Sequence, residues 1–202
     1  MQEADRLIAA AIAGLDASVG PRHADTVVAR NALGVLRLRQ GRLGAAIATL
    51  QRVERDEVRL FGADHLSVGK TQFQLGSALL LAGRAAEAAT VLRRSLRVAM
   101  ASSGAGSAPH ALAALTLASA LARKGNAAAE ARGLVAGADQ ALHKQFGAAS
   151  PYRLNVLLGQ ADVATAYADR AAVCAEAVRV VAGDAALAGL WRQDFRASCP
   201  RF

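Results

Sequence analysis

The sequence predicts an all-α protein built as a linear array of stacked helix pairs. Apolar residues recur at a constant spacing of 42 residues, and a glycine recurs with the same period after each predicted first helix. A period of this length is typical of an array in which each unit buries its apolar side against its neighbours. The recurring residues are Ile8, Leu50, Leu92 and Leu134; Leu33, Leu75 and Leu117; and the glycines Gly41, Gly83 and Gly125.

The composition favours helices throughout. Hydrophobic residues make up 53% of the chain and charged residues 20%, which is not the composition of a disordered protein. Alanine, the strongest helix former, is the most frequent residue and lets helices approach closely. Only four prolines occur among 202 residues, so long stretches contain no helix breaker.

Three complete repeats are expected, each with two helices. Repeat one covers residues 20–61, with helices over about 24–40 and 43–60. Repeat two covers residues 62–103, with helices over about 66–82 and 85–102. Repeat three covers residues 104–146, with helices over about 109–124 and 127–145. The recurring glycine is expected to end each first helix, because a glycine just past a helix readily takes the left-handed conformation.

The two ends of the chain depart from this pattern. Residues 1–19 match the second helix of an incomplete repeat, whose apolar stripe is exposed unless another segment covers it. Residues 147–182 are expected to form a degenerate fourth repeat, with helices over about 151–167 and 170–181. Residues 183–202 are predicted to be a capping helix and tail, which begins near Asp184 and uses Trp191 to seal the last open face.

Charge and cysteine content narrow the possible partners and location. The net charge of +8 is spread along the chain, whereas nucleic-acid-binding proteins usually concentrate it, so nucleic acid is a weak alternative as a partner. The longest apolar run, residues 111–122, is shorter than the ~20 residues that cross a bilayer. The two cysteines, Cys174 and Cys199, are too few for a disulfide scaffold. We therefore expect free thiols and a cytoplasmic location.

No group of residues in the sequence predicts catalysis, a metal site or a cofactor. His23 and His65 recur one period apart in turns, which indicates a structural role. No two histidines have the spacing of a zinc protease, and the cysteines lie too far apart in sequence for a metal-binding pair. A nucleophilic pair of Cys174 with His143 is disfavoured, because Cys174 occupies a position where other repeats carry a small buried residue.

Two stretches carry a resemblance to a known family. Asn31-Ala32-Leu33-Gly34 is followed by Gly41-Arg42, Ala46 and Leu50, and Leu75-Gly76 is followed by Gly83-Arg84, Glu87-Ala88 and Leu92. Over about residues 1–170 the chain resembles tetratricopeptide repeats (TPR), whose usual unit has about 34 residues. The longer period, with Gly-x-x-His before each of the first two first helices, resembles the kinesin light chain type. The resemblance implies a right-handed superhelical solenoid of antiparallel helix pairs, with the first helices lining a concave groove.

The resemblance also implies where a partner would bind. In the kinesin light chain-like pattern, an asparagine of the first helix grips the backbone of a bound peptide. The matching positions here are Asn31, Phe73 and Leu115, of which only Asn31 keeps the family residue. By register, the predicted groove residues are Val28, Asn31, Val35 and Leu38; Lys70, Phe73, Ser77 and Leu80; and Leu112, Leu115, Ser119 and Ala122. We expect an apolar or weakly acidic segment to bind there. Alternatively, these residues pack against neighbouring helices.

The favoured function is therefore a non-catalytic module that binds a peptide segment or a partner domain in its groove. The alternative is the C-terminal TPR region of a longer bacterial regulator, such as a serine/threonine protein kinase or a transcription regulator. In that case an upstream domain of the same chain is a further partner. The open face of the N-terminal helix could instead pair two copies into a homodimer.

Overall fold

The chain is helical throughout its described part. The computed structural model describes residues 2–125, 127–147, 150–164, 167–182 and 198–199, and every extended regular element in these ranges is an α-helix. The helices are α1 (Gln2–Ser18), α2 (Ala24–Arg39), α3 (Leu43–Phe61), α4 (Leu66–Leu81), α5 (Ala85–Ser103), α6 (Ala108–Lys124), α7 (Ala128–Phe146), α8 (Arg153–Val163) and α9 (Tyr167–Ala182). The all-α prediction is confirmed for these residues.

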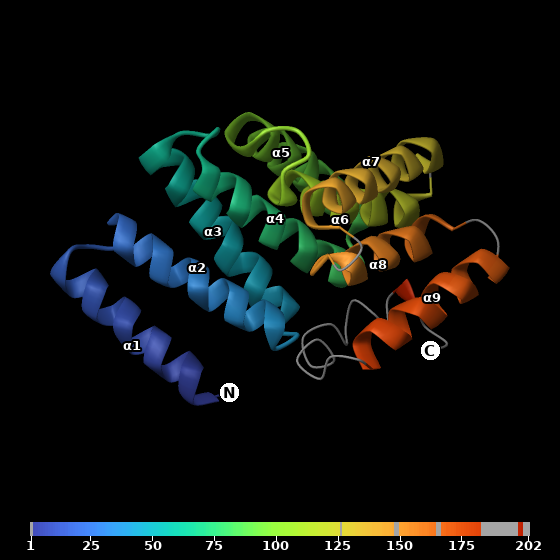
Figure 1. Ribbon diagram of the computed structural model, residues 1–202. Helices are drawn as coiled ribbons and strands as arrows, with labels where there is room; N and C mark the ends of the chain where they lie inside the picture. The colour runs from blue at the N-terminus through green and yellow to red at the C-terminus, as the bar shows by residue number, and fades with distance from the viewer. Residues whose placement is uncertain (1, 126, 148–149, 165–166, 183–197, 200–202) are drawn as a thin grey trace.

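The helices form pairs that stack in chain order. Helix α2 packs on α3, α4 on α5 and α6 on α7, and each pair contacts the next one. The connections inside a pair are short, as at residues 40–42, which makes its two helices antiparallel. Figure 1 shows the resulting curved path, from α1 at the lower left through α5 at the top to α9 at the lower right. The predicted solenoid of helix pairs is confirmed.

Glycine ends the first helix of each complete pair. Gly41, Gly83 and Gly125 have φ angles of 72°, 76° and 84°, in the region that disfavours residues with a side chain. In the first pair, the N–H of Arg42 then donates to the carbonyl of Arg37 at 2.9 Å. This bond satisfies a carbonyl that the helix itself leaves free. The predicted role of these glycines is confirmed.

The turn before each first helix provides its N-cap. Nδ1 of His23 accepts a hydrogen bond from the N–H of Asp25 at 3.3 Å, and Nδ1 of His65 accepts one from the N–H of Ser67 at 3.2 Å. In the third pair, the hydroxyl of Ser107 takes this role. These bonds satisfy N–H groups that the first turn of a helix leaves free. The structural role predicted for the two histidines is therefore confirmed.

The two helices of a pair touch where a glycine faces a leucine. A Cβ at Gly34 would lie 2.8 Å from Cδ2 of Leu50, and a Cβ at Gly76 would lie 2.5 Å from Cγ of Leu92. Only a residue without a side chain allows this approach, which buries both leucines completely. The 42-residue period thus reflects a glycine–leucine contact that is repeated in the first two helix pairs. Its four leading residues Ile8, Leu50, Leu92 and Leu134 lie on α1, α3, α5 and α7.

The buried contacts between a second helix and the next first helix become less polar from α1–α2 to α5–α6. Arg30 Nη2 of α2 forms an ion pair with Asp16 Oδ1 of α1 at 2.6 Å. At the next junction, Gln72 Nε2 of α4 donates to Glu54 Oε1 of α3 at 2.9 Å. At the α5–α6 junction, the positions equivalent to Glu54 and Gln72 belong to the main apolar cluster. These positions are Leu96 and Ala114.

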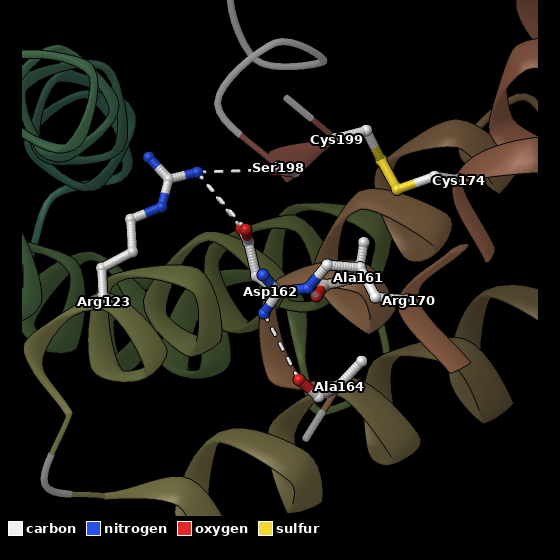
Figure 2. Close-up of a disulfide and its surroundings, with 8 residues drawn as sticks. All are labelled: Arg123, Ala161, Asp162, Ala164, Arg170, Cys174, Ser198 and Cys199. Carbon is white, nitrogen blue, oxygen red and sulfur yellow. Dashed lines mark hydrogen bonds and ion pairs between the residues drawn. A yellow bond between two sulfur atoms is a disulfide. The ribbon is translucent and has the colours of Figure 1, made fainter. Parts of the chain in front are cut away.

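Beyond α7 the pattern changes. The predicted helices over 151–167 and 170–181 are observed over Arg153–Val163 and Tyr167–Ala182. Helix α8 ends early because the backbone of Ala164 is extended and Arg170 donates to the carbonyls of Ala161 (2.9 Å) and Ala164 (3.3 Å), as Figure 2 shows. A side chain that satisfies the last carbonyls stabilises a helix end. The capping helix predicted near Asp184, with Trp191, lies outside the described residues.

A disulfide joins α9 to the C-terminal segment. Cys174 and Cys199 are bonded, as Figure 2 shows. Both are buried in a second apolar cluster with Leu154, Leu157, Leu158, Ala161 and Ala177. The prediction of free thiols is therefore wrong. A separation of 25 residues says nothing about distance in space, and α8 and α9 bring the two cysteines together. The cytoplasmic location inferred from free thiols loses that support.

Candidate functional site

The outward sides of α2, α4 and α6 form the surface where the groove was predicted, and we call this surface the first-helix face. Its side chains recur with the 42-residue period, so that each helix contributes four equivalent positions. They are Val28, Ala32, Val35 and Arg39; Lys70, Gln74, Ser77 and Leu81; and Leu112, Thr116, Ser119 and Arg123, of which Ser119 is buried.

The predicted groove residues differ in how far they reach this surface. Val28 is 62% exposed and Lys70 is exposed. Seven residues are partly exposed: Asn31, Val35, Leu38, Phe73, Ser77, Leu112 and Ala122. Three are buried: Leu80, Leu115 and Ser119. Packing against neighbouring helices accounts for these three, which leaves the surface concentrated on α2 and α4.

Helix α8 covers part of α6. A Cβ at Gly159 of α8 would lie 3.0 Å from Cδ2 of Leu115, so this glycine lets α8 lie close against α6. Leu115 is buried beneath it. The first-helix face therefore becomes narrower towards its C-terminal end.

Asn31 links the first two pairs. Its side-chain Nδ2 donates to Oγ1 of Thr71 at 2.8 Å and to Oε1 of Gln74 at 3.0 Å, and both partners lie on α4. The two hydrogens of the amide are thus used inside the protein. Oδ1 of Asn31 is not buried and accepts no hydrogen bond from the described residues. Asn31 therefore offers a free acceptor at the first-helix face.

Gln74 was not among the predicted groove residues. It lies on α4 one position after Phe73, and it is partly exposed. Thr116 is its equivalent on α6 and is also partly exposed. The signal in the sequence was a polar residue at one register position of two successive first helices. The preceding register position carries the apolar residues Phe73 and Leu115, which resemble groove residues more closely than Gln74 and Thr116 do.

The charge of the first-helix face is mainly positive. Lys70 and Arg39 form no ion pair with any described residue, and both are exposed. At the other end, Arg123 Nη2 lies 3.3 Å from a carboxylate oxygen of Asp162 and 3.4 Å from the hydroxyl of Ser198, as Figure 2 shows. The positive charges without an ion-pair partner among the described residues therefore lie on α2 and α4, where an acidic group of a partner would be attracted.

A buried carboxylate lies beneath this surface. Glu57 of α3 is only 4% exposed, and its Oε2 has no hydrogen-bond partner in the described chain. Burial raises the pKa of Glu57 above its ordinary value of 4.5, and nearby Glu54 raises it further, whereas the Thr71 hydroxyl and His65 oppose this shift. The free energy of ionising such a buried carboxylate depends strongly on the hydrogen-bond donors and charges next to it.

The outward sides of the second helices carry charges that are largely paired. Arg93 of α5 lies 3.0 Å from Glu130 of α7, and Arg94 of α5 lies 3.3 Å from Glu54 of α3. These pairs join successive repeats at partly exposed positions and contribute little stability each. They also engage Arg93 and Arg94, whereas Arg97 on the same helix is exposed and forms no ion pair with a described residue.

Neither a free cysteine nor a cluster of metal ligands occurs among the described residues. Cys174 is bonded to Cys199 and is not available as a nucleophile. In the described ranges, no three His, Cys, Asp or Glu side chains lie together as metal ligands would. No helix in these ranges is long and apolar enough to cross a membrane.

Comparison with known proteins identifies the fold. No family model matches the chain, and no curated protein sequence matches it significantly. Among solved structures, the chain is similar to nearly identical TPR-like repeats of a kinesin light chain-like protein from Podosopora anserina. The TM-score is 0.64 at 18% sequence identity, over 100% of this chain and 89% of that chain. A single-substitution variant of the same repeats gives a TM-score of 0.65 at the same identity and coverage. The chain thus has the fold of a kinesin light chain-like TPR solenoid.

Proposed function

We propose that this chain is a non-catalytic interaction module whose first-helix face binds a segment of another protein. The observation that carries the proposal is the exposed side of α2 and α4. There, Val28 of α2 stands largely in solvent, and Arg39 at the end of α2 and Lys70 of α4 are exposed and form no ion pair with any described residue. An isolated apolar side chain needs no explanation, but apolar residues and free charges on the stacked helices of a solenoid are typical of a binding surface.

The surface suggests the chemistry of the bound segment. Val28, Val35 and Leu112 offer apolar contacts, and Lys70 and Arg39 attract carboxylates. The free Oδ1 of Asn31 accepts a hydrogen bond. We therefore propose a segment with apolar side chains and at least one acidic residue. It would lie across α2 and α4 with its ends towards α1 and α6.

A selection experiment tests this proposal. Peptides selected from a random library against the whole chain would be measured by fluorescence anisotropy with the wild type and with a double variant, Val28→Ser with Lys70→Glu. We expect binding to weaken at least about tenfold, which corresponds to ~1.4 kcal/mol. Arg97→Glu is the matched control, since Arg97 is exposed on the second helix α5 and carries the same charge.

The two variants separate the surfaces. Loss of binding in the double variant, with wild-type affinity in Arg97→Glu, would support the first-helix face. Equal affinities in all three proteins, or loss in the control alone, would reject it. Circular dichroism of each variant checks that the helices are intact, so that a loss of binding reports on the surface.

The outer side of α1 is a second surface that a partner could cover. Leu7 is 66% exposed, and α1 packs on α2 among the described helices. We propose that another helix covers this side, either from a second copy or from a longer chain such as a bacterial kinase or transcription regulator. Light scattering coupled to size exclusion tests the first option. A dimer that Leu7→Lys dissociates would support a homodimer, and a monomer at all concentrations would exclude it.

A further inference from the structure

Three polar residues occur together at one junction of the array. They are Asn31 on α2, Glu57 on α3 and Thr71 on α4. Asn155 lies two periods after Thr71, but one period later the positions of all three are apolar, and two periods later those of Asn31 and Glu57 are apolar as well. These apolar equivalents are Phe73 and Leu115, Ala99 and Ala141, and Ala113. The three polar groups therefore occur as a set at the junction of the first two pairs.

The hydrogen bonds of Thr71 leave one donor unassigned. Its side chain is fully buried, and its oxygen accepts from Asn31 Nδ2 at 2.8 Å. The hydroxyl proton meets no other acceptor among the described residues. Glu57 has the complementary deficit, because its buried Oε2 receives no donor from the described residues, as is also true of the buried Oε1 of Gln72. The Thr71 hydroxyl also stabilises the ionised form of Glu57. Buried polar groups of this kind are normally paired with each other.

We propose that the Thr71 hydroxyl donates to Glu57, and that these two residues position the Asn31 amide for binding. With its proton directed at a carboxylate, Thr71 can only accept from Asn31. The Asn31 amide must then turn its NH2 group inward to Thr71 and Gln74 and its Oδ1 outward. Glu57 and Thr71 are thus positioning residues, which act on a partner through Asn31.

The outward Oδ1 of Asn31 favours a partner that offers a hydrogen-bond donor at the first-helix face. This step rests on the proposed function. Because Asn31 Oδ1 is the free atom, the partner must offer an N–H at this point, whereas a carbonyl or carboxylate would meet another acceptor. An acceptor that becomes buried without a donor is costly, so the direction of the Asn31 amide discriminates between a partner N–H and a partner carbonyl or carboxylate.

Protonation of Glu57 would reverse the chain of hydrogen bonds. A neutral Glu57 can donate to Thr71, whose own proton then points to Asn31 and draws its Oδ1 inward. The charged groups around Glu57 are His65, in the turn before α4, and Glu54 on α3, which is itself paired with Arg94 of α5. The amide of Asn31 would therefore respond to the ionisation of a residue that does not touch it.

Nuclear magnetic resonance tests this without any partner. In the labelled whole chain, the side-chain amide signals of Asn31, identified by their absence in Asn31→Asp, would be followed against pH together with the carboxyl carbon of Glu57. We expect the two to change with one midpoint. Thr71→Val should uncouple them, Thr71→Ser should keep them coupled, and Glu57→Gln should remove the response. The amide of Asn155 on α8 serves as the internal control.

The outcomes are distinct. An Asn31 signal that ignores the Glu57 titration, or follows it equally in folded Thr71→Val, would overturn the proposal. If Thr71→Val does not fold, the wild type, Thr71→Ser and Glu57→Gln still decide the matter. Failure here would leave the binding proposal standing, because that proposal is tested by the variants of Val28 and Lys70.

Discussion

The backbone of Gly76 lies against the side chain of Leu92, so close that a Cβ at residue 76 would come within 2.5 Å of the leucine Cγ. This contact brings α4 and α5 together at the centre of the array. Gly76→Ala should therefore lower the free energy of unfolding by about 1–2 kcal/mol. Overpacking costs ~1–3 kcal/mol, and the higher helix propensity of alanine offsets up to ~1 kcal/mol of it. Urea denaturation would measure the change.

Gly133→Ala is the matched control for this substitution. Gly133 lies inside α7 with nothing near the place of a Cβ, and it is exposed. The same change should there stabilise the protein by about 0.5–1 kcal/mol, because only the helix propensity differs. Equal effects at the two sites would contradict the packing argument.

The disulfide should stabilise the C-terminal part of the array. Replacing both Cys174 and Cys199 by serine removes a covalent link across a loop of 25 residues. The expected loss is about 2–4 kcal/mol, mostly because the unfolded chain gains conformational freedom. Thermal unfolding of the double variant and of the wild type would measure it.

The bond itself can be checked directly. Mass spectrometry of unreduced peptides should find Cys174 linked to Cys199, and the denatured protein should show no free thiol. Two reactive thiols in protein purified without reductant would contradict the disulfide.

The histidine caps should contribute at the start of the first helices. His65→Ala removes the acceptor for the N–H of Ser67 and should cost about 1 kcal/mol. His65→Asn should recover most of it, since asparagine is a good cap. His143→Ala on α7 is the control, because His143 is exposed and caps no first helix. Chemical denaturation of the three variants would rank them.

Glu57 should make stability depend on pH. Its pKa is raised in the folded protein, mainly by burial, so the folded state holds the proton more tightly than the unfolded state. Stability from this group is therefore present below pH 4.5 and is lost as the pH rises through the raised pKa. Between pH 4 and pH 7, the wild type should lose more stability than Glu57→Gln.

Urea titrations at several pH values would show this difference. Glu3→Gln serves as the control, because Glu3 is exposed on α1. A Glu57→Gln variant with the pH dependence of the wild type would contradict the assignment.

Much of the fold could be predicted because the same local sequence signals recur in successive repeats. The glycines that end the first helices and the histidines that cap them act within a few residues of chain, so their spacing reveals them. The glycine–leucine contact within a pair recurs too, at Gly34 with Leu50 and at Gly76 with Leu92, although only the structure revealed it. Each of these signals recurs, and recurrence separates it from chance.

The features that escaped prediction depend on contacts between distant segments. Cys199 meets Cys174 only because α8 and α9 leave the regular pattern. Leu115 is buried because Gly159 lets α8 approach, and the degenerate fourth repeat gave no sign of this. The partners of Asn31, Thr71 and Gln74, lie on α4. The sequence pattern favoured the neighbouring apolar residue Phe73 as the equivalent groove position instead. The binding face itself stays a prediction.

The α1 end of the array and its centre differ in the contacts that hold them. The α1–α2 junction depends on the ion pair of Arg30 with Asp16, whereas the α5–α6 junction is apolar and the far end carries a covalent link. In a solenoid, each unit is held by its neighbours alone, so local opening starts where those contacts are weakest. Fraying should begin at α1 and move inward, and amide hydrogens of α1 should exchange with solvent before those of α6. Asn31 lies next to this loosening end, so a ligand bound there would also slow the breathing of α1.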